Sequence, residues 1–481
     1  MARNYLTYEE FGAKGDGVHD DFPSIIACHE EANIRNLPVR ARDGASYYIS
    51  GSSKTAIIKT DVDFSKAKFI IDDRNVESRE SYVFTVLSDH EPIELKLNPI
   101  KRTDSKVDIG LAGNYYVKIK NQNKKIYIRK GLNMNNGTST VDAFIVNKNG
   151  EVFPSINWDY PEVTYAYARC TDDSPITVKG GHFVTVANEE ESFYRYYQRG
   201  FLVNRSHVLF TDVYHTVDNE GEHGAPYHGF IRVNDSYDVT IKDCLLTPRF
   251  IYKTESQIPG QTVSMGSYDL SFWCSIDVRC LNVKQTIDIK DAKYWGIYTS
   301  NFCKNLILED CIISRFDAHQ GVTNATIRRC TLGHQGVQLI GHGDFILEDT
   351  TLYSRTDMIY LRCDYGSLWD GNITVKNCDW YTQNVKLAII GGNNVGDHDY
   401  GYLCRFGKNI TLDGIRVHAP NLGSEQDHYL FLIKNGSFDP KMPFAEFPPE
   451  KLLYRGIVVD NGTKVQISNH PEFFKNAEEI K

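Results

Sequence analysis

The stretch Leu306-Ile307-Leu308-Glu309-Asp310-Cys311 shows a pattern that recurs along the chain. Its alternate residues are apolar, as in a β-strand with one buried face, and a polar turn and a small residue follow. The same pattern occurs at residues 239–244, 325–330, 345–350, 373–378 and 410–415. Because such a repeat returns the chain to an equivalent position, we predict that these strands stack in parallel as the coils of a solenoid.

Cys244, Cys311, Cys330 and Cys378 take the last position of this pattern. We expect their side chains to point inward and to form a stack of small apolar groups. Zinc ligands usually come in close pairs such as Cys-x₂-Cys, and none of the eleven cysteines is spaced in that way. An odd number of cysteines also fits free thiols better than a disulfide framework. The sequence therefore predicts no metal cofactor, with a calcium ion at a carboxylate cluster as the alternative.

The spacing of these positions predicts where the solenoid lacks loops. Cys244 and Cys311 are 67 residues apart, which is enough for two coils with long loops. Cys311 and Cys330 are 19 residues apart, and Cys330 and Thr350 are 20 apart, close to the minimum for one coil. We therefore expect a bare strip between looped neighbours, which is a groove suited to a chain-like substrate.

Residues 11–21, Phe-Gly-Ala-Lys-Gly-Asp-Gly-Val-His-Asp-Asp, form a glycine-rich loop before an apolar stretch. Asp20 or Asp21 can cap the helix that follows, and Pro23 suits its first turn. This motif resembles the start of proteins of the pectate-lyase superfamily, which includes polygalacturonase-like and phage tailspike proteins. The resemblance covers this cap and the general coil pattern. It implies an all-β, right-handed, single-stranded parallel β-helix with an N-terminal capping helix, in which Asp16, Asp20 and Asp21 are structural.

Three segments follow from these patterns. Residues 1–73 are predicted to form the N-terminal cap and first coils, and residues 173–481 the main β-helix with a C-terminal cap. Residues 74–172 break the repeat, and Asn135-Asn136-Gly137 and Asn149-Gly150 divide stretches of period-two alternation there. This is typical of β-hairpins, so we predict a β-rich insertion. Its expected role is packing or oligomer contact, with glycan binding as the alternative.

The formal net charge of −9 argues against nucleic acid and an anionic membrane as partners. It does not exclude an acidic polysaccharide, because a local cluster of Arg, Lys and His can outweigh the overall charge. The first ten residues lack the apolar core of a signal peptide, and no run of 18 apolar residues occurs. We expect a cytoplasmic protein, or a secreted or periplasmic one whose leader has been removed.

Glycine-centred triplets suggest a second strand in each coil. They are Arg199-Gly200-Phe201, His228-Gly229-Phe230, Trp295-Gly296-Ile297, Gln320-Gly321-Val322 and Gln335-Gly336-Val337. Two residues before each glycine stand Gln198, Tyr227, Tyr294, His319 and His334. If the triplets share one frame, the last four side chains form an exposed ladder with steps of about 4.8 Å. We predict His319, His334 and Tyr294 as catalytic residues, and Tyr227 and His228 as substrate-binding residues.

Further polar residues surround this ladder, and Asp317 is predicted to be catalytic. The predicted substrate-binding residues are Arg315, Arg355, Arg362, Tyr360, Asp364 and His342. A guanidinium pairs with a carboxylate through two hydrogen bonds, so we expect the arginines to hold a uronic-acid carboxylate. A neutral imidazole can accept a proton, so His319 or His334 is the expected base. Neighbouring arginines would lower the imidazole pKa, whereas Asp317 would raise it.

Two reactions fit these residues, and both act on a polysaccharide or oligosaccharide. β-Elimination on a uronic-acid-containing glycan needs a base, an acid and a cation beside the carboxylate, so a polysaccharide lyase is our first prediction. A glycoside hydrolase would use paired carboxylates drawn from Asp317, Asp344, Asp357 and Asp364. Gly341-His342-Gly343 looks like the Gly-His-Gly of polygalacturonases, but the aspartates of that family's pattern are absent. A tailspike-like solenoid that binds glycan without cleaving it is the third alternative, and a homotrimer is the expected oligomer.

Overall fold

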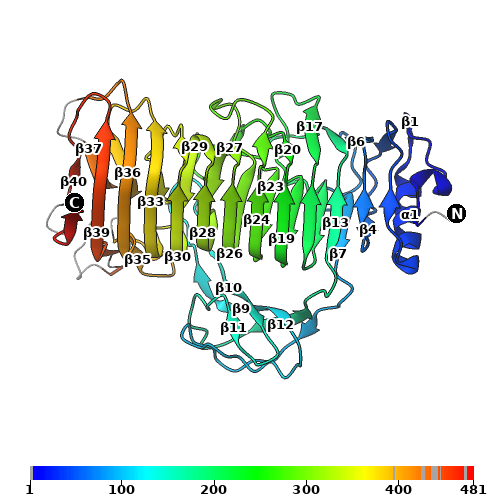
Figure 1. Ribbon diagram of the computed structural model, residues 1–481, viewed down its shortest axis with the longest axis horizontal. Coiled ribbons are helices and arrows are strands. Elements are labelled where there is room, and N and C mark those ends of the chain that lie inside the picture. The colour runs from blue at the N-terminus through cyan, green and yellow to red at the C-terminus, as the bar shows by residue number, and fades with distance from the viewer. Residues whose placement is uncertain are drawn as a thin grey trace. The chain divides into compact units, whose positions relative to one another are not determined.

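A computed structural model describes residues 4–193, 195–393, 396–423, 428–434, 443–444, 446–470 and 474–480. The chain divides into two compact units. The first unit comprises Met1–Ile93, Leu111–Tyr116 and Ala168–Tyr298, and the second comprises Glu94–Gly110, Val117–Tyr167 and Thr299–Lys481. Parallel strands stack on one another within each unit (Figure 1). The fold is the predicted all-β, right-handed, single-stranded parallel β-helix.

The N-terminal motif forms the predicted helical cap of the first unit. Helices η1 (Tyr8–Phe11) and α1 (Phe22–Arg35) flank the glycine-rich loop, and Pro23 lies in the first turn of α1. Asp21 holds this loop, because its two carboxylate oxygens accept the backbone N–H groups of Lys14 (2.6 Å) and Gly15 (3.0 Å). The carboxylate of Asp20 accepts the N–H of the first helical residue. These contacts support the structural role that the sequence predicted for Asp20 and Asp21.

In the first unit each full coil carries three strands, one in each of three parallel sheets. One coil runs through β13 (Ile176–Lys179), β14 (His182–Val186) and β15 (Phe201–Asn204). The next coil repeats it in β16 (Val208–Thr211), β17 (Tyr214–Asp218) and β18 (Ile231–Asn234), and each strand pairs with its counterpart. The remaining strands of this unit's coils are β1 (Asp16–Asp20), β2 (Val39–Arg40), β3 (Ser46–Ile49), β4 (Ala56–Ile58), β5 (Val62–Asp63), β6 (Lys68–Asp72), β7 (Phe84–Leu87), β19 (Tyr237–Lys242), β20 (Leu245–Leu246), β23 (Leu270–Trp273), β24 (Ile276–Leu281) and β25 (Lys284–Gln285). A separate hairpin pairs β21 (Tyr252–Glu255) with β22 (Thr262–Met265).

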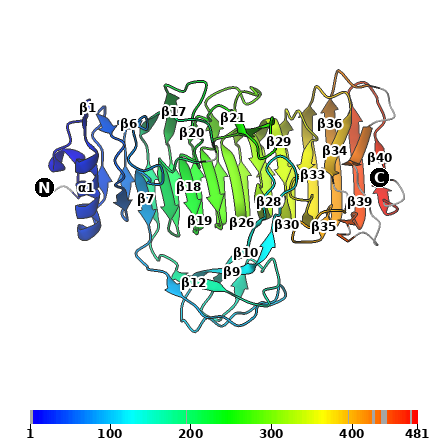
Figure 2. The ribbon, with the colours of Figure 1, turned by 180° about the vertical axis from the view of Figure 1, so that it is seen from behind.

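The second unit contains the bare coils that the spacing of the cysteines predicted. Strands β27 (Ile312–Asp317) and β28 (Gln320–Arg328) form one coil, and β29 (Thr331–Leu339) and β30 (Gly341–Glu348) form the next. Figure 2 shows β28, β30 and β33 following one another in this unit. The other strands are β26 (Tyr298–Glu309), β31 (Thr351–Leu352), β32 (Ile359–Leu361), β33 (Trp369–Tyr381), β34 (Leu387–Asn393), β35 (Cys404–Arg405), β36 (Asn409–His418), β37 (His428–Lys434), β38 (Glu446–Phe447), β39 (Lys451–Val459), β40 (Gln466–Ser468) and β41 (Ala477–Glu479).

A single left-handed residue ends the repeated strand in coil after coil. The backbone φ lies between 49° and 58° at each such position: Asp212, Asp243 and Asn282 in the first unit, and Asp310, Arg329, Asp349 and Asn377 in the second. Asp and Asn tolerate this conformation better than other non-glycine residues, because their short side chains can hydrogen-bond locally. The polar turn of the repeat is therefore the place where the chain bends from one sheet into the next.

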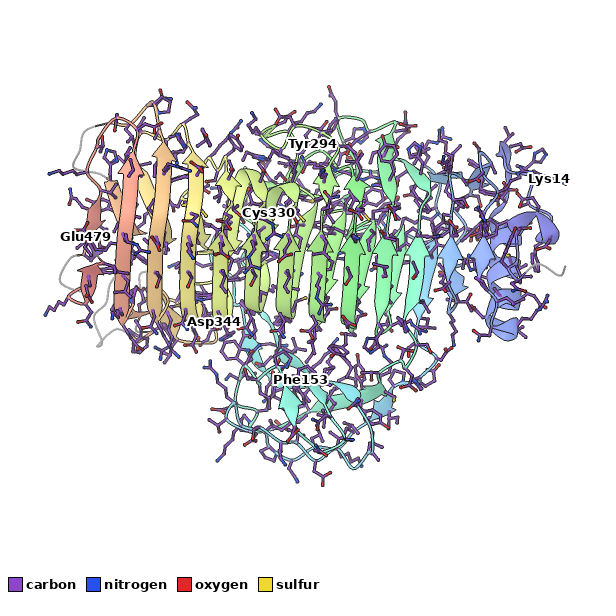
Figure 3. The ribbon with its side chains drawn as sticks, viewed as in Figure 1. Lys14, Phe153, Tyr294, Cys330, Asp344 and Glu479 are labelled. Carbon is purple, nitrogen blue, oxygen red and sulfur yellow. The ribbon has the colours of Figure 1, made fainter. Side chains whose placement is uncertain are left out.

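The predicted cysteine column is buried. Cys244 in the first unit and Cys311, Cys330 and Cys378 in the second are each at most 3% exposed. In the second unit the backbone N–H of Cys311 donates to the sulfur of Cys330 on the next coil (3.4 Å). Figure 3 labels Cys330 among the strands of this unit. Parallel stacking and inward-pointing cysteines, both predicted from the repeat, are thus confirmed.

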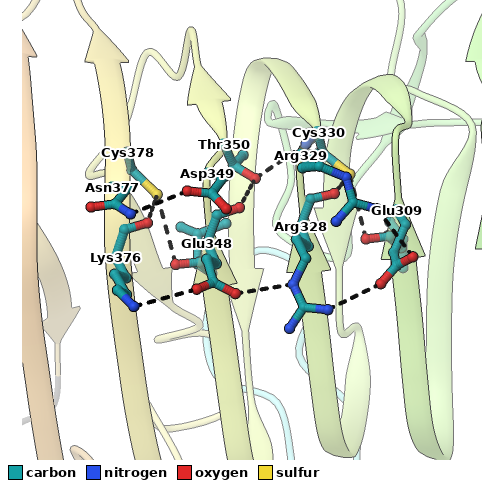
Figure 4. Close-up of polar contacts among 12 residues, drawn as sticks. Glu309, Arg328, Arg329, Cys330, Glu348, Asp349, Thr350, Lys376, Asn377 and Cys378 are labelled. Carbon is teal, nitrogen blue, oxygen red and sulfur yellow. Dashed lines mark hydrogen bonds and ion pairs between the residues drawn. The ribbon is translucent and has the colours of Figure 1, made fainter.

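A charged ladder follows the exposed ends of the repeated strands in the second unit (Figure 4). Arg328 lies between Glu309 (3.2 Å) and Glu348 (3.0 Å), and Lys376 reaches Glu348 from the following coil (3.7 Å). Opposite charges on neighbouring strands attract, whereas like charges would repel. Each pair is exposed and contributes at most about 1 kcal/mol, so the ladder favours correct register more than it adds stability.

The interrupting segment forms a separate sheet. Strands β8 (Ile93–Glu94), β9 (Tyr115–Ile126), β10 (Thr138–Val146), β11 (Val152–Phe153) and β12 (Tyr165–Cys170) pair in the order β11-β10-β9-β12-β8. Strands β10 and β11 are antiparallel and turn at Asn149-Gly150, as predicted. The sheet lies inside the predicted range 74–172, but β7 in that range pairs with β4 and β15 as a coil strand.

Buried polar contacts fix this insertion to the coils of the second unit. Lys304 on β26 pairs with Asp142 on β10 (2.6 Å) and donates to the backbone oxygen of Ser155 (2.6 Å). Both charged side chains are at most 1% exposed. Breaking one partner of such a pair would leave a buried charge and cost about 3–5 kcal/mol, so the insertion is held firmly here.

Candidate functional site

One outer face of the second unit carries most of the candidate residues. Strands β27, β29, β32, β34 and β37 pair in a register that aligns Asp317, Gln338, Tyr360, Gly391 and Leu432 in one row. The residues that precede them on these strands are fully buried. Since successive side chains of a strand point to opposite sides, the row lies on the outside of the coils. We call this surface the β29 face.

A network of charges begins at Asp317 on this face. The guanidinium of Arg362 donates to Asp317 (2.6 Å) and, through two nitrogens, to Asp364 (2.8 and 3.1 Å). Arg315 pairs with the other oxygen of Asp317, and Arg129 from the insertion pairs with Asp364 (2.8 Å). Three arginines therefore alternate with two aspartates. Arg129 is the outermost of them with Asp364, each with a side chain 21% exposed.

The arginines decide which groups of this network carry a charge. Burial raises the pKa of the Asp317 carboxyl, but the attraction of Arg315 and Arg362 outweighs it and holds the pKa below its ordinary value. The pKa of Asp364 is also held low, because Arg362 and Arg129 outweigh its burial. Both carboxyl groups are therefore ionised at neutral pH.

His319 lies at the edge of the network. Burial and the neighbouring Arg362 lower the pKa of its imidazole to about 4, against the opposing attraction of Asp317. Its Nε2 is 3.2 Å from the hydroxyl of Tyr365, and the ring is half-buried. The imidazole is therefore neutral at pH 7 and remains able to accept a proton.

The predicted ladder of His319 and His334 is wrong. Gly336 pairs with Arg315 on β27, whereas the strand that contains Gly321 pairs with β26 and β30. The two glycines are 15 residues apart, but one coil takes 19 or 20, so they cannot be equivalent. The expected exposure of His334 is also wrong, because only 4% of it is exposed.

The predicted arginine clamp also needs correction. Arg315 is fully buried and Arg362 is 8% exposed, and aspartates already pair with both. Neither guanidinium can receive a substrate carboxylate without releasing a buried partner. Arg355 alone among the three predicted arginines is exposed.

The candidates in the first unit are mostly packed against their neighbours. Tyr227 is 4% exposed, contrary to prediction, and the guanidinium carbon of Arg249 lies 3.5 Å from its ring centre. Tyr227 pairs with Tyr197, not with Gln198, so the predicted frame is displaced by one residue here too. His228 and Tyr294 are half-buried: His228 stacks on Tyr196 (4.6 Å), and Tyr294 packs on Phe250 (5.1 Å).

An open cleft of ≈ 500 Å³ lies beside Tyr360 and Leu432 on the β29 face. Its lining residues are Arg355, Thr356, Asp357, Tyr360, Asn384, Val385, Lys386, Leu387, Ala388, Leu432 and Lys434. The side chains of Arg355, Lys386 and Lys434 are exposed, so positive charge gathers at this cleft although the whole chain is negative. We call it the Arg355 cleft.

Asp357 is the one carboxyl that lines this cleft. Burial raises its pKa, and Lys434, whose Nζ is 4.0 Å from Oδ2, offsets that rise only in part. The carboxyl lies over the backbone of Gly391, where a Cβ atom would approach its Oδ2 to 1.7 Å. Only glycine leaves room for Asp357 in this position. A carboxyl with a raised pKa can donate a proton to a bound ligand.

The sequence reasoning missed two contributors to this region. Arg129 lies in the insertion, 235 residues before its partner Asp364, and no local pattern relates them. Gly391 carries no side chain to attract notice. His342, predicted here, is 4% exposed and belongs to a different group of charges around Asp370.

Metal and membrane features were searched over the residues that the structure describes. No group of three or more His, Cys, Asp or Glu side chains among them is arranged to hold a metal ion. In the same part of the chain, no helix has the length and apolar character needed to span a membrane. The expectations on cofactors and on localisation remain predictions.

Stacked parallel coils with a helical cap and an outer cleft define a β-helix protein. No protein-family model and no curated protein matches the sequence. Solved structures share the fold. The tailspike gp61 of Pseudomonas phage phi297 has a TM-score of 0.56 at 11% identity, over 95% of this chain and 81% of that one. The tailspike gp49 of Pseudomonas phage LKA1 has a TM-score of 0.55 at 12% identity, over 98% of this chain and 84% of that one.

A third solved structure contains a saccharide. The tailspike Gp54 of Acinetobacter baumannii bacteriophage AP22, in complex with A. baumannii capsular saccharide, has a TM-score of 0.54 at 10% identity. The match covers 99% of this chain and 79% of that one. At such low identities the three tailspikes establish the common fold of this chain, and its chemistry has to be argued from its own residues.

Proposed function

We propose that this protein is a carbohydrate-active enzyme that binds an anionic polysaccharide on the β29 face and cleaves it at the Arg355 cleft. The main support is the cleft itself, where Arg355, Lys386 and Lys434 surround a single carboxyl, Asp357, with a raised pKa. Positive charge concentrated in a cleft attracts anionic groups even when the net charge is negative. The saccharide bound to the AP22 tailspike adds support from a related fold.

The reaction that this cleft favours is β-elimination on a uronic-acid-containing glycan. The cations of the cleft would stabilise the charge that develops on the substrate carboxylate when the adjacent proton is removed. Asp357 would protonate the leaving oxygen. His319, neutral and on the same face, is the candidate base. Arg355 and Tyr360 keep the substrate-binding roles that the sequence suggested for them.

Hydrolysis is the second candidate, and a specific observation favours it. Two carboxyl groups near Tyr360 have pKa values shifted in opposite directions, upward at Asp357 and downward at Asp364. Glycosidases use one protonated and one ionised carboxyl, and opposed environments are how proteins produce such a pair. In this reaction Asp357 would again be the proton donor.

A panel of acidic and neutral polysaccharides would test the proposal. Elimination produces an unsaturated uronate that absorbs near 235 nm, whereas hydrolysis produces new reducing ends without that absorbance. Asp357→Asn should lower turnover at least ~10²-fold in either reaction, because it removes the proton donor. His319→Ala should lower it to a similar extent only in elimination.

The matched control is Asp344→Asn. Asp344 is exposed in the second unit and bonds to Asn372 (2.8 Å), away from the residues that line the cleft. Its variant should keep full turnover. If no substrate of the panel is cleaved but an acidic glycan binds, the chain is a glycan-binding solenoid and the enzymatic proposal is wrong. The homotrimer is a further proposal, which light scattering of the purified protein would test.

A further inference from the structure

A second group of charges in the second unit surrounds Asp370 on β33. Its carboxylate lies 2.6 Å from Arg102, 3.0 Å from Lys408 and 3.7 Å from Arg405. Asp370 is almost buried, with a side chain 9% exposed, whereas the three cations are between 31% and 44% exposed. Asp159 accepts the backbone N–H of Arg102 (2.8 Å), so positive charges outnumber negative ones by three to two.

His342 on β30 faces the same group. Its Nδ1 is 4.0 Å from Asp370, the residue is 4% exposed, and neither ring nitrogen has a hydrogen-bond partner. Burial lowers its pKa to about 3, so the ring is neutral and one of its nitrogens carries a hydrogen to donate. Buried donors are almost always partnered in folded proteins, so this one calls for a ligand or a bound water.

The insertion forms the other side of this group. Arg102 comes from the insertion, and the ring of Trp158 stands perpendicular to that of His342 (87°) at 4.6 Å. Trp158 also stacks on Tyr402 (5.7 Å). The aromatic ring excludes water from His342, which strengthens electrostatic interactions at this point.

From this juxtaposition we propose that the insertion and the coils of the second unit together bind an oxyanion between Arg102, Lys408, Arg405 and His342. We call this the Asp370 site. Asp370 positions the cations, and their remaining N–H groups, with that of His342, would donate to the anion. The site shares no residue with the Arg355 cleft, and its existence does not require that the protein cleave anything.

Two sources can supply such an anion, and they share one chemistry. The carboxylate of an acidic sugar and free inorganic sulfate both present oxygens to arginine and lysine donors. Titration calorimetry at constant ionic strength, with sodium glucuronate, sodium sulfate and neutral glucose as probes, distinguishes them. Binding of glucuronate assigns the site to acidic saccharides, and binding of sulfate alone assigns it to a free oxyanion. Both results support the oxyanion site, and equal binding of glucose would overturn it.

Lys408→Gln locates the binding. A charge-assisted hydrogen bond is lost, so the Kd of the bound probe should rise about tenfold or more. The matched control is Lys376→Gln, because Lys376 is similarly exposed and contacts a carboxylate in the outer ladder without a buried histidine nearby. Its variant should bind as the wild type does. No binding of either anion, or equal weakening by both substitutions, would overturn the proposal.

Discussion

Replacing Asp317 by Asn should unfold the second unit more readily than any exposed substitution. The Asp317 carboxylate is fully buried between Arg315 and Arg362. The variant keeps the shape but removes the negative charge, which leaves two buried guanidinium groups facing a neutral amide. Removing one partner of a buried ion pair costs about 3–5 kcal/mol. Asp310→Asn is the control, because Asp310 pairs with Arg329 at the surface with 55% of its side chain exposed, and such a pair is worth at most about 1 kcal/mol.

Urea unfolding followed by circular dichroism would measure both variants. The pH dependence gives a second readout, because the pKa of Asp317 is lower in the folded protein than its ordinary value. A lowered pKa stabilises the fold above the unfolded-state pKa, about 3.9, and this contribution is lost as the pH falls toward the folded-state value. The wild type should therefore lose more stability than Asp317→Asn below about pH 4. A loss under about 1 kcal/mol at neutral pH for Asp317→Asn would refute the reasoning.

Three further outcomes are expected. Gly391→Ala should displace Asp357, because the new Cβ would lie 1.7 Å from its carboxylate, and turnover on a confirmed substrate should fall at least tenfold while Gly260→Ala, in open space, leaves it unchanged. If Asp357 is the proton donor, kcat/KM should fall as the pH rises through its raised pKa, and a profile identical to that of Asp357→Asn would exclude the role. Cys330→Leu should lose about 1–3 kcal/mol in thermal or urea unfolding because the coil interior has no room for the larger side chain, and unchanged stability would contradict the tight cysteine column.

The fold could be predicted because its determinants are local and repeated. Alternation in residues 306–311 fixes which side chains point inward, and the turn residue Asp310 adopts the left-handed conformation that its type tolerates. Each coil gives the same information again, so an error in one coil is corrected by the next. The N-terminal loop is equally local, since Asp21 bonds to residues only six and seven positions away.

The candidate site could be predicted only in part, because its determinants are not local. Arg315 and Arg362 stand out in the sequence as exposed cations, but Asp317 and Asp364 neutralise them in the folded chain. The glycine triplets fixed an incorrect frame, because a 15-residue step is shorter than any coil. Polar residues on loops and insertions find their partners only after the coils have stacked, and Arg129 is the clearest case.

The left-handed turn and the 19-residue step between Cys311 and Cys330 make the coil a modular unit of evolutionary change. Removal or duplication of one whole coil preserves which side chains face inward, because every later strand moves by one step along the axis. An insertion or deletion of a single residue within a strand reverses inside and outside instead. Length variation should therefore accumulate in the loops or in whole coils. A lineage can lengthen its glycan-facing surface in this way without redesigning its interior.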